Sequence, residues 1–208
     1  MDYHNVIRGV LERITNRGVD PYYTKRPPVT PEDIQLFNCG GDIELPDQLC
    51  RFYIEFSNGF ELRWNTEDEE ECGEINFPTL ENLARRRTRW INRVNSFAND
   101  PKSLNQCIDP EHRLRAFKIW ELMKDWLPLV QGPEGDSYCI RLSDAVMVFD
   151  KHDWFDGFGS PRLAQSNGLI IGDTFDDFFS AWAYRDFEDP WFSDSLHLEG
   201  MERLEWPD

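Results

Sequence analysis

One short segment, residues 45–59, constrains the fold more than any other part of the sequence. Its bulky apolar side chains recur at three- and four-residue spacing, the period of a helix that buries one face. They are Leu45, Leu49, Phe52, Tyr53 and Phe56. Pro46 is tolerated in a first turn because its missing N–H would have no intrahelical partner there, and Gly59 can adopt the left-handed conformation that ends a helix. The segment therefore predicts a short helix whose aromatic face lies in the core.

Strands are predicted by alternation of apolar and polar residues and by short apolar runs. Residues 60–64 alternate directly after Gly59, and the other predicted strands are residues 73–77, 126–130, 137–142 and 145–149. The last three are separated by tight turns at residues 132–136 and 143–144. This arrangement predicts an antiparallel meander.

Helices are predicted where apolar residues form one stripe between a start and a stop signal. Four further helices follow from this pattern: residues 3–17, 30–38, 78–97 and a last helix that starts near Asp173. In the last one Thr174 and Asp177 have the spacing of a capping box, with Asp in the usual place of Glu or Gln. Residues 19–29 contain three prolines and are predicted to form a stiff connector.

The net charge of −17 disfavours nucleic acid as a direct partner, because phosphate backbones bind clustered Lys and Arg. A basic protein is the expected partner, and the alternative is that the acidity only maintains solubility. Arg85, Arg86 and Arg89 lie off the apolar stripe of their helix. An RNA-binding face is one interpretation of them, but the overall charge favours a solvated or salt-bridged face.

The five cysteines are scattered and include no C-x-x-C pair, which predicts a reduced, cytoplasmic setting. The first residues lack the basic and apolar regions of a signal peptide. No stretch approaches the roughly 20 apolar residues of a membrane span. We therefore expect neither secretion nor membrane insertion.

Candidate catalytic groups are few. The sequence has no glycine-rich phosphate loop, no G-x-S-x-G elbow and no H-E-x-x-H helix. Cys139 with His152 could form a nucleophilic pair, but Cys139 lies in the middle of a predicted strand, where a reactive thiolate is not expected. Asp150, His152 and Asp153 could hold a metal, although a hydrogen-bonded strand end explains them better. We expect no catalytic residue, no cofactor and no metal.

The candidate partner-binding residues are acids that flank aromatic side chains in three stretches, near residues 67–71, 150–156 and 186–194. Such mixtures suit protein interfaces, where aromatic residues anchor in pockets and charge steers the encounter. Solvated loops are the alternative for each stretch. The candidates are Glu67, Asp68, Glu69, Glu70, Glu71, Asp150, Asp153, Trp154, Phe155, Asp156, Asp186, Glu188, Asp189 and Trp191.

Several of these segments together resemble the SUKH superfamily, in particular its Smi/Knr branch. The resemblance covers residues 30–184 discontinuously and depends on pattern more than on single diagnostic residues. The similar segments are Leu45-Pro46 with the aromatic helix and Asn58-Gly59, then Gly73-Glu74-Ile75, Trp126-Leu127-Pro128-Leu129, Gly135-Asp136-Ser137-Tyr138-Cys139-Ile140, residues 146–150 and residues 174–182.

The resemblance implies an α+β fold with a mainly antiparallel sheet flanked by helices, no catalytic residues and a role in binding other proteins. It divides the chain into an N-terminal helix and connector (1–29), a SUKH-like domain (30–184) with an insertion at 98–118, and an acidic, aromatic tail (185–208).

Many bacterial members of the superfamily are immunity proteins that occlude toxins, often nucleases. The expected function is therefore that of an immunity protein that neutralises a basic toxin domain, such as a nuclease, through acidic loops. The alternatives are a regulatory scaffold of the Smi/Knr type and a hydrolase that uses carboxylates or a metal.

Overall fold

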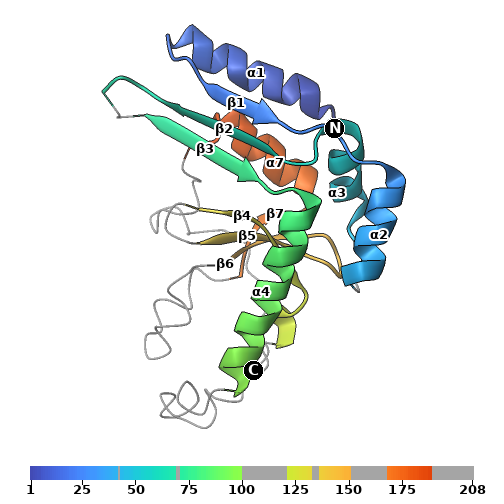
Figure 1. Cartoon of the computed structure of the whole chain (residues 1–208). Helices are drawn as coiled ribbons and strands as arrows, with labels where there is room; N and C mark the ends of the chain where they lie inside the picture. The colour runs from blue at the N-terminus through green and yellow to red at the C-terminus, as the bar shows by residue number, and fades with distance from the viewer. Residues whose placement is uncertain (42, 69–70, 100–120, 133–135, 151–167, 189–208) are drawn as a thin grey trace, which may run out of the picture.

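The computed structural model describes residues 1–41, 43–68, 71–99, 121–132, 136–150 and 168–188, and it has an α+β fold with two antiparallel sheets (Figure 1). The expected fold class is thereby confirmed. In chain order the elements are α1 (Tyr3–Asn16), β1 (Tyr22–Lys25), α2 (Pro31–Gly41), α3 (Asp47–Arg51), the π-helical turn η1 (Phe52–Phe56), β2 (Phe60–Asn65), β3 (Cys72–Phe77), α4 (Leu80–Asn99), β4 (Trp126–Gln131), β5 (Ser137–Arg141), β6 (Met147–Asp150), β7 (Leu169–Gly172) and α7 (Phe175–Tyr184).

The two sheets have simple strand orders. The first is β1-β2-β3 and the second is β4-β5-β6-β7, each antiparallel throughout. The predicted meander of the second sheet is confirmed. Two strands were not among those predicted from the sequence: β1 lies inside the predicted connector 19–29, and β7 follows Gly168 in a stretch where no strand was predicted. Both have only four residues, so alternation gives a weak signal.

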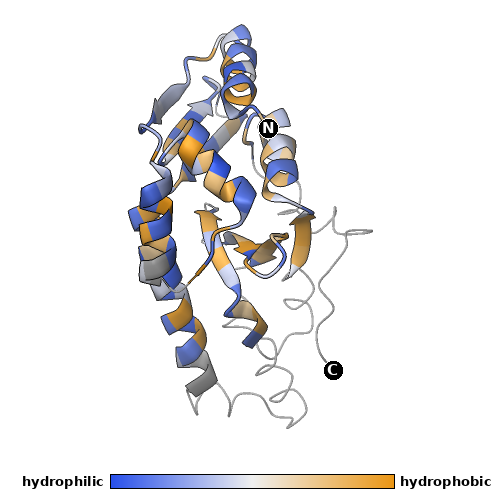
Figure 2. Ribbon diagram, turned by 90° about the vertical axis from the view of Figure 1, so that its right-hand side faces the viewer, coloured by the Kyte–Doolittle hydropathy of each residue, from blue (hydrophilic) through white to orange (hydrophobic). Residues whose placement is uncertain are grey.

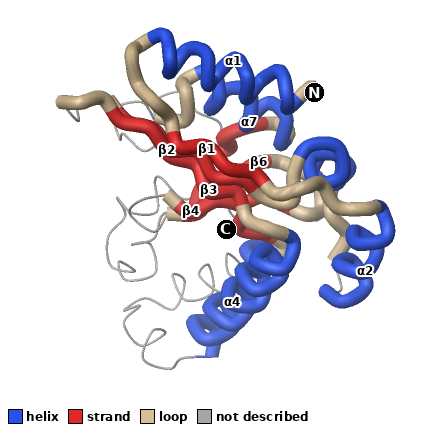
Figure 3. Tube along the Cα trace, turned by 45° about the horizontal axis from the view of Figure 1, so that its top comes forward, coloured by secondary structure: helices blue, strands red, loops and turns tan. Residues whose placement is uncertain are grey.

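Helices cover the strands on two sides. α1 and α7 lie on one side and α4 lies on the other (Figures 1 and 3). α1 packs against α7, α7 against β7, and α4 against β4. Hydrophobic and hydrophilic residues alternate along α4 in Figure 2, as expected for a helix that buries one stripe.

Phe52 is the centre of the aromatic core. Its ring centroid lies 4.4 Å from that of Phe77, 5.1 Å from that of Tyr3 and 5.5 Å from that of Phe175. The predicted burial of the 45–59 helix face is confirmed, since all five of its apolar residues are buried. The helix changes from α-helical to π-helical hydrogen bonding at Phe52–Phe56, where the Ser57 N–H donates to the Phe52 carbonyl, five residues earlier, at 3.1 Å. This π-helical closure differs from the simple helix that the spacing predicted.

The turn after η1 joins two elements of the fold. Gly59 has φ +96°, and a Cβ there would lie 3.0 Å from the Phe77 carbonyl oxygen, so the position favours glycine on two grounds. Asn58 accepts a hydrogen bond from the Leu80 N–H at 2.9 Å and so caps the start of α4. This turn therefore positions α4 as well as β2.

The residues after α7 belong to the folded core. Phe187 is buried, and its carbonyl accepts from the Glu74 N–H of β3 at 3.1 Å. The Trp64 indole N–H donates to the Asp186 carbonyl at 2.7 Å. Residues 1–29 also contribute, through α1 and β1. Residues on both sides of the expected boundaries at 29/30 and 184/185 therefore contribute to the packed core.

Two other expectations concern the insertion at 98–118 and the absence of a membrane-spanning helix. The expected insertion at 98–118 begins with the last two residues of α4, and residues 100–118 lie outside the described residues. Within the described ranges, no helix combines the length and the apolar character needed to cross a lipid bilayer.

Candidate functional site

The β2–β3 hairpin carries the first predicted acidic stretch at its loop. Glu67, Asp68 and Glu71 are exposed there, and Glu69 and Glu70 lie outside the described residues. Thr66 closes the loop: its N–H donates to the Glu71 carbonyl at 2.9 Å, and its hydroxyl accepts from the Glu71 N–H at 3.1 Å. The loop thus has a fixed base beneath its carboxylates.

Arg17, the C-cap residue of α1, contacts this hairpin. Its guanidinium lies 5.1 Å from the centre of the Trp64 ring, a cation–π contact. It also forms ion pairs with Glu71 at 3.3 Å and with Glu188 at 3.2 Å. Arg17 therefore neutralises part of the charge of both predicted acids and joins the hairpin to the segment after α7.

Asp186 contradicts the prediction that it is an exposed interface residue. Its side chain is 1% exposed, and it pairs with Arg13 at 2.7 Å and with Arg17 at 2.6 Å. The cause is a backbone reversal after α7, where Asp186 and Phe187 both adopt positive φ, 54° and 60°. The reversal turns the chain back onto β3 and places the Asp186 carboxylate against α1.

Asp150 is also misassigned as a surface residue. It ends β6, opposite Ser137 in the register, and its side chain is 0% exposed. Four predicted partner-binding residues of the second acidic stretch lie outside the described residues, as do Asp189 and Trp191 of the third. The full set outside is Glu69, Glu70, Asp153, Trp154, Phe155, Asp156, Asp189 and Trp191.

Cys139 has the environment of a structural thiol. It is buried in β5, and burial together with the charge of Asp150 raises its pKa well above the usual value of a thiol. The reactive thiolate is therefore disfavoured. His152, its suggested base, lies outside the described residues. In the described part of the chain, no three His, Cys, Asp or Glu side chains group closely enough to hold a metal ion.

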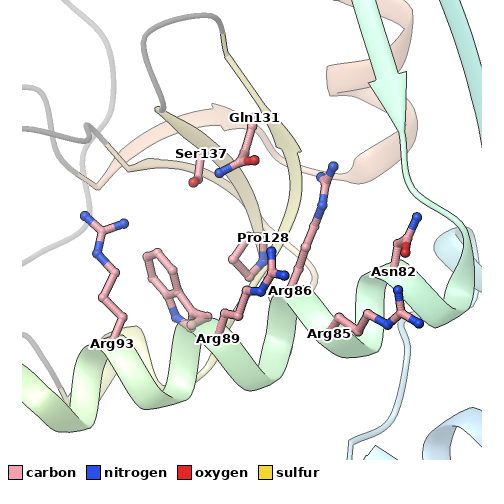
Figure 4. Close-up of a pocket in the computed structure, with 9 residues that line it drawn as sticks. Asn82, Arg85, Arg86, Arg89, Arg93, Pro128, Gln131 and Ser137 are labelled. Carbon is pink, nitrogen blue, oxygen red and sulfur yellow. The ribbon is translucent and has the colours of Figure 1, made fainter.

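A groove of about 420 Å³ lies between α4 and the β4–β5 pair (Figure 4). Arginines of α4 form one wall, and side chains of the two strands form the other. Its lining residues are Asn82, Arg85, Arg86, Arg89, Trp90, Arg93, Pro128, Gln131 and Ser137. The sequence pattern identified the arginines as a polar helix face, but nothing in it indicated the opposing strand wall.

The arginines of α4 have different environments. Arg86 donates to the Leu129 carbonyl, and Arg87 donates to the Trp126 carbonyl at 2.7 Å, so both attach α4 to β4. Burial lowers the pKa of both guanidinium groups. Arg85 forms an ion pair with Glu81 on the exposed side of the helix. The predicted salt-bridged face is thus correct for Arg85, whereas Arg86 has a structural anchor.

Arg13 and Arg17 are the residues that sequence reasoning missed at the hairpin. They stand one turn apart at the end of α1, a position where basic residues are common for helix-dipole reasons alone. Their acid partner Asp186 lies far away in sequence. No local pattern could have indicated the pairing.

Comparison of the chain with protein-family models and with curated proteins found no match. The resemblance to the SUKH superfamily therefore stands on the segments named in the sequence analysis.

Proposed function

We propose that the chain is a non-enzymatic protein-binding module of the SUKH type, an immunity protein that neutralises a basic toxin domain. The observation that carries the proposal is the exposed loop of the β2–β3 hairpin, where Glu67 and Asp68 lie above a base fixed by Thr66 and Arg17. The α+β fold and the buried 45–59 helix face support the resemblance on which the immunity role depends.

Two physical effects favour binding at this loop: its charge accelerates association with a basic partner, and its ordered base reduces the conformational entropy lost on binding. Carboxylates on a protein of net charge −17 attract a basic partner and accelerate association. Because the hydrogen bonds of Thr66 and the contacts of Arg17 already order the base of the hairpin, less conformational entropy is lost on binding. A nuclease toxin presents a basic substrate-binding surface, which carboxylates can occupy in place of phosphates.

The experiment is co-expression of the chain with each basic protein encoded beside its gene. We expect one of these proteins to arrest growth when expressed alone, to be tolerated with the chain, and to co-purify with it. The double variant Glu67→Gln/Asp68→Asn should lose protection. A matched control, Glu32→Gln/Glu44→Gln, removes two exposed charges near α2, away from the hairpin loop, and should retain protection.

The outcomes separate the proposed roles. A neighbouring protein that binds but is not toxic would contradict the immunity role and favour a regulatory scaffold of the Smi/Knr type. Equal protection by the two double variants would contradict the assignment of the hairpin loop as the binding surface.

A further inference from the structure

The groove beside α4 concentrates positive charge in an acidic protein. Four of its lining residues are arginines, one of which, Arg85, is paired with Glu81, whereas the net charge of the chain is −17. Arg85, Arg89 and Arg93 follow one another at four-residue spacing, so their Cα atoms extend over about 12 Å along one side of the helix. Figure 4 shows the side chains of Arg86, Arg89 and Arg93 rising from α4 on the side of the strands, whereas that of Arg85 runs along the helix near Asn82.

The opposite wall supplies neutral hydrogen-bonding groups. Gln131 of β4 and Ser137 of β5 line the groove across from the helix, and Asn82 lines it near the start of α4 (Figure 4). A ligand in the groove would therefore meet guanidinium groups on one side and amide and hydroxyl groups on the other. Such convergence of a few polar groups is typical of small-molecule sites, and the volume is within their usual range.

Two of the arginines, Arg86 and Arg89, present positive charge in the groove. Arg86 is held in place by its hydrogen bond to the Leu129 carbonyl, so it presents charge at little further entropic cost. The Arg89 side chain is exposed, and its guanidinium group makes no hydrogen bond or ion pair with any residue that the structure describes. Burial of Arg86 lowers its pKa, and the positive charge of Arg89 lowers it further, because the two guanidinium groups repel each other. A bound anion would relieve this repulsion.

We propose that this groove binds a small molecule that carries two or more linked phosphate groups. Guanidinium groups bind phosphate oxygens in pairs with good geometry, and a row of them suits an anion with several such centres. Nucleic acid fits less well, because its charge continues beyond the groove and would meet an acidic protein. The inference goes beyond the proposed function, since the groove and the hairpin loop lie on different elements.

The test is calorimetric titration of the full chain with inorganic tripolyphosphate and pyrophosphate at physiological ionic strength. We expect binding of one anion per chain. Arg89→Gln should raise the dissociation constant about tenfold or more, the effect of losing one charged hydrogen-bonding partner. Because the Arg89 side chain is exposed, this variant should keep the melting temperature of the parent chain.

Arg8→Gln is the matched control. Arg8 is exposed on α1, away from α4, and its loss changes the net charge equally. It should change the dissociation constant by less than about twofold, the size expected for a distant screened charge. Equal weakening by both variants, or no binding of either phosphate compound, would overturn the proposal.

Two further ligands test the chemical class. Citrate that binds as tightly as tripolyphosphate would overturn the assignment to phosphates, and a single-stranded RNA oligonucleotide that binds more tightly through Arg89 would overturn the assignment to a small molecule. Arg89→Gln should leave capture of the basic partner unchanged. Failure of the groove and failure of the immunity role can therefore be told apart.

Discussion

Asp186 joins the two ends of the described chain through one carboxylate. Its carboxylate forms ion pairs with Arg13 of α1 and with Arg17 at the C-cap of that helix, and its backbone carbonyl accepts a hydrogen bond from the Trp64 indole N–H of β2. A buried carboxylate is tolerated only when it is paired, and removal of one partner leaves the others without compensation. The side chain that the sequence suggested as a binding residue is therefore a structural one.

Asp186→Asn should lower the free energy of unfolding by about 2–4 kcal/mol, because two arginines lose a charged partner at a buried position. Chemical denaturation measures this change. Asp20→Asn is the control, since Asp20 is exposed, and it should stay within about 0.5 kcal/mol of the parent chain. Equal stability of the two variants would show that the ion pairs of Asp186 contribute nothing net.

Tyr3 and Tyr53 give the fold a dependence on alkaline pH. The Tyr3 hydroxyl donates to the Asp176 carboxylate at 2.6 Å, and the Tyr53 hydroxyl donates to the Pro78 carbonyl at 3.0 Å. Burial raises the pKa of both phenols, and for Tyr3 the Asp176 carboxylate raises it further. Each folded-state pKa exceeds the unfolded value of about 10, so the stabilisation is complete below that value and is lost as pH rises above it.

We therefore expect the free energy of unfolding to fall as the pH rises above about 10. Tyrosinate absorbance of the folded chain should rise less with pH than that of the chain in denaturant. Tyr53→Phe should reduce the difference. Complete ionisation of all tyrosines while circular dichroism still reports a folded chain would contradict the account.

At the scale of elements, the chain after α7 pairs with β3 only because Gly73 lacks a side chain. Gly73 bridges to Glu188, and a Cβ at this glycine would lie 2.6 Å from the Asp186 carbonyl oxygen. Real Cβ atoms do not approach carbonyl oxygens so closely, so a methyl group must displace the returning segment. The pairing of two distant elements therefore depends on one absent side chain.

Gly73→Ala should lower the free energy of unfolding by about 1–3 kcal/mol, the usual effect of overpacking. Hydrogen exchange of the Glu74 amide should accelerate, since its acceptor is the Phe187 carbonyl. Gly40→Ala is the control, because open space surrounds that glycine in α2. It should be neutral or stabilising, as alanine favours helix by about 1 kcal/mol. Similar losses in both variants would contradict the close-approach argument.

Elements with a strong period could be predicted from the sequence, and elements defined by their partners could not. The buried face of residues 45–59 and the meander of residues 126–149 follow from local spacing. β1 could not be predicted in this way, because most of its side chains are exposed and it forms by backbone pairing with β2. Local patterns carry no signal for such a strand.

The candidate site residues show the same difference: those determined by local sequence could be predicted, and those determined by distant partners could not. Exposure of Glu67 and Asp68 could be predicted, because neighbouring carboxylates in a run of acids repel one another and are most stable in solvent. Burial of Asp186 could not, since it depends on arginines in the first helix. The arginines of α4 were visible as a helix face, but the groove also needs Gln131 of β4 and Ser137 of β5, which local spacing along α4 does not indicate.

At the scale of the whole molecule, charge is separated along β3. This strand begins at the acidic hairpin loop and ends where the chain enters α4, so the two candidate surfaces start from its opposite ends. The cluster of Arg13, Arg17 and Asp186 supports the acidic end, and Arg86 and Arg87 attach α4 at the other. A single scaffold can therefore present two surfaces of opposite sign.

The central claim is that the exposed hairpin carboxylates capture a basic protein. The most direct measurement is the association rate constant with the co-purifying basic partner as a function of salt. We predict that this rate falls about tenfold or more as salt shortens the Debye length to about 8 Å and below, and that Glu67→Gln/Asp68→Asn flattens the dependence. A rate that does not change with salt, or an unchanged slope in the double variant, would contradict the claim.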